Sequence, residues 1–294
     1  MLPVALVENV SDSFYVRSKT NQTRYIDGKI GSLDTPPEID TNATTDTFAC
    51  QDYGWIAKVA LKEANMADVP LALEQNAVLD AMAMMYLARE VRVATLLTTS
   101  ANYDSGNVQT LSGASQWNAS NGNGDIFGVI ETARASIWRA PNTRLVAFCG
   151  YQVWQQLKNH PQFIDRIKGG ATKQNIAAGA ELKKAFADAI EVSEFYVAES
   201  RYTASNAGAT ASYSRIWGKH FGVLAIPDFP STRSLGFGLT FRWNAAGSQS
   251  GINVADWFEP GPGTQGAKKF KVTHSDVEKV CANDAGALIV NAVA

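Results

Sequence analysis

The chain has 294 residues, of which 46% are hydrophobic and 18% are charged, and its formal net charge is −2. This length and apolar content are enough for a sizeable core, so disorder is excluded as the main state. Binding of nucleic acid through bulk charge is also excluded, because it needs clustered Lys and Arg, and the pI is near 6.0. The charged fraction lies below the roughly 25% of typical soluble proteins, which favours a surface that becomes interface.

Neither a membrane segment nor a metal site is expected from the sequence. The N-terminus lacks the basic start of a signal peptide, and the most apolar long segment, residues 71–97, is interrupted by charged side chains. The three cysteines lie far apart and form no zinc-binding pattern, so we expect buried thiols in a reducing compartment. These features predict a protein made in the cytoplasm, with no cofactor, no metal and no membrane contact.

The N-terminal part predicts an extended arm followed by a hairpin. Residues 1–46 show no core-forming pattern, and the proline pair at 36–37 favours extended backbone before it. Over residues 47–59 apolar and polar side chains alternate as in a strand, and a change of phase at 52–54 predicts a bulge or kink. Paired with residues 24–30, this strand would form a long hairpin, which is marginal alone and needs a partner surface.

Residues 71–98 predict one long helix. The segment contains no Gly or Pro, and apolar residues such as Ala77 and Ala81 repeat at spacings of three and four. A helix of about 28 residues would be roughly 42 Å long, more than twice the mean helix length. Arg89 and Arg92 fall near its C-terminal end, where the helix dipole favours positive charge.

The rest of the chain predicts helices and strands that alternate only loosely, as in a mixed sheet flanked by helices. Asp125 is expected to cap the second helix. The predicted helices are residues 125–138, 153–157 and 181–187. The predicted strands are residues 145–149, 190–198, 214–217, 221–226, 235–243, 254–258 and 268–273. The C-terminal segment 286–293 is mostly apolar. We expect these C-terminal strands to pair beside the long helix, so that both chain ends share one domain.

No catalytic motif emerges from the sequence. His160, His220 and His274 are the three histidines, and each fits a packing or surface role. Residues 261–266 match GxGxxG, but they do not lead from a clear strand into a helix, and Pro262 removes a backbone donor. No GxSxG serine elbow is present. An enzyme is therefore not predicted.

The order of the segments resembles the major capsid proteins of tailed bacteriophages. The likeness is carried by residues 141–146 (PNTRLV), residues 154–161 (WQQLKNHP) and residues 234–243 (SLGFGLTFRW). Upstream, a polar arm, a kinked aromatic hairpin and a long helix occur in the order of that family's N-terminal arm, extended loop and spine helix. The resemblance spans nearly the whole chain.

The resemblance implies an α+β capsid fold with an N-terminal arm, an extended β-hairpin loop, a long spine helix, a peripheral domain and an axial domain. The axial domain would surround the five-fold and six-fold axes of a shell. The implied division is 1–23 for the N-terminal arm, 24–66 for the extended loop, 67–121 for the peripheral domain with its spine helix, 122–243 for the axial domain, and 244–294 for the C-terminal strands of the peripheral domain.

The resemblance also implies a structural protein of the virion. Copies would self-assemble into pentamers and hexamers that form the icosahedral head of a phage around double-stranded DNA, without sequence-specific binding. Expected partners are further copies of the chain, a separate scaffolding protein and a portal, with a decoration protein left open. The alternative is an encapsulin-like bacterial compartment, which uses the same fold to enclose protein cargo. An enzyme of unrecognised type is a more distant alternative.

In this family the extended loop would lie across a neighbouring subunit, and the residues agree with that reading. A hairpin bearing Phe48, Tyr53 and Trp55 cannot bury both faces on itself, so a neighbour would supply the cover. We therefore predict inter-subunit contacts at these three residues and at Arg24 and Lys58.

Overall fold

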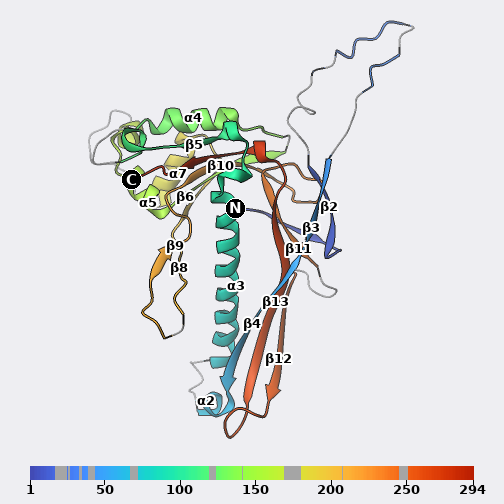
Figure 1. Ribbon diagram of the computed structural model, residues 1–294, viewed down its shortest axis with the longest axis vertical. Coiled ribbons are helices and arrows are strands. Elements are labelled where there is room, and N and C mark those ends of the chain that lie inside the picture. The colour runs from blue at the N-terminus through green and yellow to red at the C-terminus, as the bar shows by residue number, and fades with distance from the viewer. Residues whose placement is uncertain are drawn as a thin grey trace.

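The structure is a computed structural model of the chain. It describes residues 1–16, 25, 27–32, 35–38, 44–66, 72–118, 124–140, 142–168, 180–206, 208–244 and 251–294. Within these residues it shows two five-stranded sheets and two two-stranded sheets, with a long helix that runs from the compact upper part into a narrow lower part (Figure 1). The predicted α+β class is confirmed.

The narrow part is built on a five-stranded sheet, called here the long sheet. Its strands are β1 (Val4–Val7), β4 (Gln51–Ala60), β11 (Gly238–Trp243), β12 (Ile252–Glu259) and β13 (Ala267–Val280). The central strand is β13, which pairs with β4 along one edge and with β12 and then β11 along the other. Strand β1 adds parallel to β11.

Helix α3 (Leu73–Thr98) lies along this sheet, as the sequence predicts (Figure 1). Ala77, Ala81 and Met85 are buried at spacings of four residues, and they form one face of the helix. That face packs on Trp55 of β4 and Val272 of β13. At about 1.5 Å per residue, the 26 residues of α3 make a rod of roughly 39 Å.

The upper part holds the second five-stranded sheet, called here the compact sheet. Its order is β5 (Val108–Thr110), β14 (Gly286–Val290), β10 (Phe221–Pro227), β6 (Thr143–Gly150) and β7 (Glu194–Ala198). All seven residues of β10 are buried, as expected for a central strand that is covered on both faces. The helices of this part are α4 (Ile126–Ser136), α5 (Tyr151–Leu157), α6 (Pro161–Lys168) and α7 (Ala180–Ala189).

Several helix predictions in this part are confirmed. The Asp125 side chain accepts a hydrogen bond from the Gly128 backbone N–H, so Asp125 is the N-cap of α4. The helices predicted at 153–157 and 181–187 correspond to α5 and α7. Helix α6 was not predicted, because Pro161 suits the first turn of a helix as well as the end of one.

The hairpin exists, but its strands differ from the prediction. Strand β3 (Thr44–Ala49) pairs with β2 (Ser11–Val16), not with residues 24–30, of which 27–30 have no regular structure. Residues 27–32 and 35–38 stand away from the body, beyond the β2–β3 pair (Figure 1). The extended loop is therefore confirmed as a feature, with its base at β2 and β3.

Of the bulge or kink predicted at 52–54, the bulge is absent. Strand β4 pairs with β13 in one unbroken register from Gln51 to Ala60. The alternation changes phase because the chain passes from one sheet to another at Cys50, whose backbone N–H bonds to Val10. Residues 51–60 thus belong to the long sheet and not to the extended loop.

The prediction that residues 1–46 lack core residues is also wrong. Ala5, Val7 and Phe14 are buried together with Phe48 and Phe241 in a small core of their own. The signal was missed because β1 is only four residues long and finds its partner, β11, more than two hundred residues away. Such short strands carry little periodicity.

The sheet topology separates the C-terminal strands. Strands β12 and β13 lie in the long sheet beside α3, as predicted for residues 254–258 and 268–273, and β11 lies in the same sheet. Strand β14, from the apolar segment predicted at 286–293, lies between β5 and β10 in the compact sheet. A predominantly apolar strand such as Gly286–Val290 shows that it is buried, but not in which sheet. The division into peripheral and axial domains itself stays a prediction.

Phe48→Ala is expected to lower the free energy of unfolding of the unassembled subunit by about 3–5 kcal/mol, because it leaves a cavity in a core. The ring of Phe48 stacks on Phe241 with 4.4 Å between centroids, and its side chain is 1% exposed. Tyr25→Ala removes a ring that is 86% exposed, and as a control it should change stability by less than about 0.5 kcal/mol. Urea denaturation followed by circular dichroism measures both. Equal stability of the two variants would contradict the placement of Phe48.

Candidate functional site

A buried ionic cluster joins helix α3 to the long sheet. The carboxylate of Asp276 on β13 is fully buried, and it lies 2.7 Å from Nη2 of Arg92 on α3 and 3.2 Å from Nη2 of Arg242 on β11. Arg92 also bonds to Glu278, with 3.1 Å between Nε and Oε2. Two arginines from two elements therefore compensate the carboxylates of β13, which makes this cluster the main polar link of the narrow part.

The electrostatics of the cluster favour the ionised form of Asp276. Burial by itself raises the pKa of this carboxyl group, but the hydrogen bond and charge of His274 and the charges of Arg92 and Arg242 outweigh it. The pKa of Asp276 is therefore lowered from its ordinary value. The Asp276 carboxylate is thus stabilised as an anion in the folded state.

Aromatic rings from β4 cover the cluster. The guanidinium carbon of Arg92 lies 3.9 Å from the ring centroid of Tyr53, a cation–π contact. Tyr53 and Trp55 both stack on His274, with 5.4 Å and 5.8 Å between centroids. His274 Nε2 in turn lies 3.2 Å from Asp276 Oδ2. Strand β4 is therefore held to β13 by side-chain contacts as well as by the backbone hydrogen bonds between the two strands.

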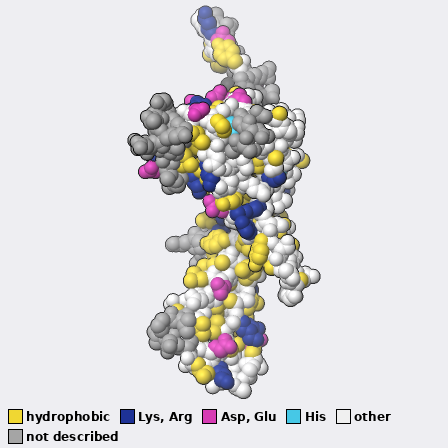
Figure 2. All heavy atoms as spheres, turned by 90° about the vertical axis from the view of Figure 1, so that its left-hand side faces the viewer, with side chains coloured by type: hydrophobic (Ala, Val, Ile, Leu, Met, Phe, Trp, Pro, Cys, Tyr) yellow, Lys and Arg dark blue, Asp and Glu magenta, His cyan; other side chains and the backbone are white. Residues whose placement is uncertain are grey.

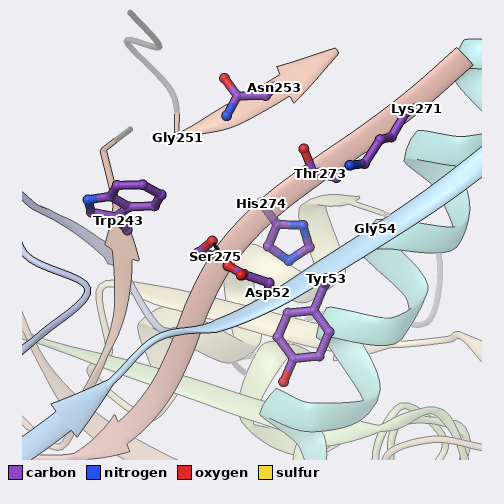
Figure 3. Close-up of a pocket in the computed structure, with 10 residues that line it drawn as sticks. All are labelled: Asp52, Tyr53, Gly54, Trp243, Gly251, Asn253, Lys271, Thr273, His274 and Ser275. Atoms are coloured by element: carbon purple, nitrogen blue, oxygen red, sulfur yellow. Dashed lines mark hydrogen bonds between the residues drawn. The ribbon is translucent and has the colours of Figure 1, made fainter. Parts of the chain in front are cut away.

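A pocket of about 360 Å³ opens beside this cluster (Figure 3). Gly54, Thr273 and Asn253 lie directly opposite one another on β4, β13 and β12. The hydroxyl of Ser275 donates to the carboxylate of Asp52, so these two polar groups of the pocket satisfy each other. We find no nucleophile paired with a base among its lining residues, and the described part of the chain holds no group of metal-binding side chains.

The predicted contact residues have different environments. Phe48 is buried in its own chain. Tyr53 and Trp55 are half-buried against His274, while Lys58 is exposed on β4. Arg24 lies outside the described residues. The structure thus gives the aromatic residues partners within the chain, so the cover that we expected from a neighbour is supplied for Phe48 entirely by this chain.

Sequence reasoning missed the residues of the ionic cluster. Arg92 was explained by the helix dipole alone, and Asp276 and Glu278 lie beyond the strand predicted at 268–273 and were given no role. A signal was present, since Asp276 occupies the inward phase of β13 together with Phe270, Val272 and His274. A carboxylate on the side of a strand that faces the core predicts a buried partner of opposite charge.

Two exposed regions remain without cover. Figure 2 shows hydrophobic side chains over the lower half of the molecule, with few charges among them. On α3 these include Leu79, Met84 and Tyr86, which are 53–61% exposed. The second region is the extended loop, in which Tyr25 is 86% exposed and Ile30 is 48% exposed. Among the described helices, none has both the length and the apolar content needed to cross a membrane.

Comparison with known proteins gives two curated relatives, and no family model matches. The chain is 28% identical over 268 residues to the major capsid protein of Pseudomonas phage JBD67, covering 90% of this chain and 81% of the relative. It is 33% identical over 159 residues to the major capsid protein of Burkholderia phage BcepMu, covering 53% of this chain and 47% of the relative. Both sequence matches are to phage major capsid proteins.

Solved structures agree at the level of the fold. A phage-related protein of Bordetella bronchiseptica RB50 superposes with a TM-score of 0.72 at 20% identity, covering 99% of this chain and 90% of that one. The capsid of cyanophage P-SCSP1u gives a TM-score of 0.54 at 10% identity, covering 98% and 86%. The chain has the fold of the tailed-phage major capsid proteins. The predicted resemblance in sequence and in fold is thereby confirmed.

In this capsid fold, α3 is the spine helix and β2 and β3 form the base of the extended loop. The buried cluster therefore fixes the spine helix to the long sheet. The Nε1–H of Trp217 donates to Oε1 of Glu90 at 2.8 Å, which fixes the same helix to the loop that precedes β10 of the compact sheet. The spine helix is thus tied by polar contacts to both parts of the subunit.

Arg92→Ala is expected to lower the free energy of unfolding of the unassembled subunit by about 3–5 kcal/mol, because it removes a partner from a buried charge. Arg134→Ala is the matched control, since Arg134 pairs with Glu191, which is 73% exposed. The control should cost less than about 1 kcal/mol. Urea denaturation at neutral pH measures both, and a loss for Arg92→Ala no greater than the control would contradict the assigned role.

The lowered pKa of Asp276 predicts acid lability. The stability that this group contributes is present above the unfolded pKa, about 3.9, and is lost as the pH falls through the lower folded pKa. Asp276→Asn should therefore be less stable than the wild type at neutral pH, and the difference should shrink as the pH falls below about 4. Denaturation curves recorded across this range measure the difference. A difference that stays constant with pH would contradict the prediction.

Proposed function

We propose that copies of this chain self-assemble, as pentamers and hexamers, into the icosahedral head of a tailed phage that encloses double-stranded DNA. The observation that supports this most directly is the match to the JBD67 major capsid protein, which extends over 90% of the chain. The capsid fold covers the same length. The near-neutral charge agrees with a container that does not hold DNA through bulk electrostatic attraction.

The proposed role is structural and not catalytic. In the pocket beside β4, Ser275 bonds to Asp52, and the described residues show no metal-binding group. Cys50, Cys149 and Cys281 are buried free thiols, and burial raises the pKa of Cys281 to about 12. Such thiols are inert at neutral pH. Described polar side chains therefore serve packing and folding.

The encapsulin-like alternative has less support, because both sequence relatives are phage major capsid proteins. Purification of shells from the native source separates the two. Shells that contain double-stranded DNA support the proposal, and shells that contain an enzyme and no DNA would replace it with the alternative. Negative-stain electron microscopy of the same material gives the diameter, which bounds the copy number.

We propose that the extended loop contacts a neighbouring copy. Its described residues have no regular structure and lie away from the body (Figure 1). The rings and aliphatic groups of Tyr25 and Ile30 are exposed in the single chain, as expected for residues that become buried on assembly. A scaffolding protein and a portal would be further partners, and a decoration protein would be optional.

Deletion of residues 20–40 is expected to leave a folded, soluble subunit that no longer forms closed shells. The strands at the base of the loop, β2 and β3, and the core around Phe48 stay intact in this variant. Thermal melting of the subunit checks folding, and electron microscopy checks assembly. A Gly/Ser segment of the same length serves as the control for loop length. Normal shells from the deletion variant would reject the role of the loop.

A further inference from the structure

Strand β12 is exposed in a way that a folded β-strand rarely is. Six consecutive residues, Asn253–Phe258, are exposed, so both faces of the strand meet solvent. They include Val254, Trp257 and Phe258, which are 48%, 39% and 53% exposed. In the described part of the chain β12 pairs with β13 alone. Its other edge therefore presents backbone donors and acceptors beside large apolar side chains.

This edge lacks the features that usually protect an edge strand. Proteins blunt such edges with Lys, Pro or unpaired charge, and Ile252–Glu259 contains no Lys and no Pro. Its two acids are compensated by β13 of the same chain. The Asp256 carboxylate lies 3.6 Å from Lys268 Nζ, and the Glu259 carboxylate lies 2.6 Å from Lys269 Nζ. The edge is therefore close to neutral and open to pairing.

We propose that β12 pairs antiparallel with β12 of a second copy across a two-fold axis at Ala255. The inference rests on the proposed function, because an icosahedral shell of identical copies contains two-fold axes where the same surface meets itself. The long sheets of two copies would then join into one continuous sheet. The second copy, and not another protein, is the partner because the edge matches its own sequence.

The register of the proposed pairing shows which residues of the two β12 strands lie opposite each other. With Ala255 opposite Ala255, Ile252 lies opposite Phe258 of the second copy, and Asn253 lies opposite Trp257 of the second copy. Val254 lies opposite Asp256 of the second copy, so no like charges meet. A shift of the axis to Asp256 would place two carboxylates opposite each other, which is destabilising. The pairing at Ala255 avoids this contact and keeps all seven residues from Ile252 to Phe258 paired.

The spine helix leaves room for this pairing. It packs mainly on β4 and β13, so most of β12 extends beyond it (Figure 1). A two-fold axis perpendicular to the sheet would place the two spine helices on the same face, each over its own β4. Side chains on the α3 face of β12, such as Val254 and Phe258, would then be covered by the second copy's strand.

Cysteine cross-linking tests the register. Residues directly opposite in an antiparallel pair have Cα atoms about 4.5–5.5 Å apart, which lies within the range of a disulfide. Ala255→Cys should therefore give a disulfide-linked dimer on oxidation of assembled shells, read on a non-reducing gel. The native cysteines do not interfere, because all three are buried.

Ile56→Cys is the matched control. Ile56 is 57% exposed on β4, the opposite edge strand of the same sheet, and it should give no dimer. Equal dimer yields from the two variants, or none from Ala255→Cys in intact shells, would overturn the proposal. Thermal melting of each unassembled variant confirms that it folds.

Hydrogen exchange of the wild type gives an independent measurement without substitutions. The backbone amides among residues 253–258 that point away from β13, which alternate with those bonded to it, should exchange at least about tenfold more slowly in shells than in free subunits, since an edge N–H that gains a partner is protected. Unchanged exchange on assembly would overturn the pairing, even if shells form. Failure of the wild type to form shells at all would instead reject the proposed function, so the two failures are distinguishable.

Discussion

Burying the carboxylate of Asp276 alone would cost several kcal/mol, and the architecture of the narrow part follows from how that cost is offset. Asp276 stands where β13 changes neighbours, because it pairs with Gln51 of β4 on one edge and with Arg242 of β11 on the other. Arg242 reaches the carboxylate from β11, and Arg92 reaches it from α3. One buried charge thus requires the helix and two strands to stay in a fixed register.

The same constraint explains why the aromatic residues of β4 face inward. Tyr53 covers the guanidinium of Arg92, and Tyr53 and Trp55 stack on His274. Rings placed over this cluster exclude water from it, and a lower local dielectric strengthens the attraction between the charges. Tyr53 and Trp55 therefore contribute to the packing of β4 within the subunit.

The sequence was most informative where the pattern was long and local. Helix α3 and the Asp125 cap follow from periodicity and capping rules, since each depends on residues within a few turns. The pairing of β1 with β11 joins residues more than two hundred positions apart, and no local pattern encodes it. Alternation at 47–59 correctly predicted strands and a change of phase. It could not distinguish a bulge from a change of sheet, because both shift the inward side by one residue.

The distribution of charge separates the surfaces that complete the subunit from those that are left for other copies. Lys268 is bound to Glu74 of α3 and to Asp256 of β12, and Lys269 is bound to Glu259 of β12. Arg92 and Arg242 are bound to Asp276. With those charges used within the chain, β12 and the exposed side of α3 present mainly apolar groups and backbone. An interface of that kind is less sensitive to salt than one made of surface ion pairs. It also gains its specificity from strand register, because backbone hydrogen bonds fix which residues lie opposite each other and side-chain pairs select among registers. A low charge content is therefore consistent with specific assembly when the few charged side chains form ion pairs within the subunit.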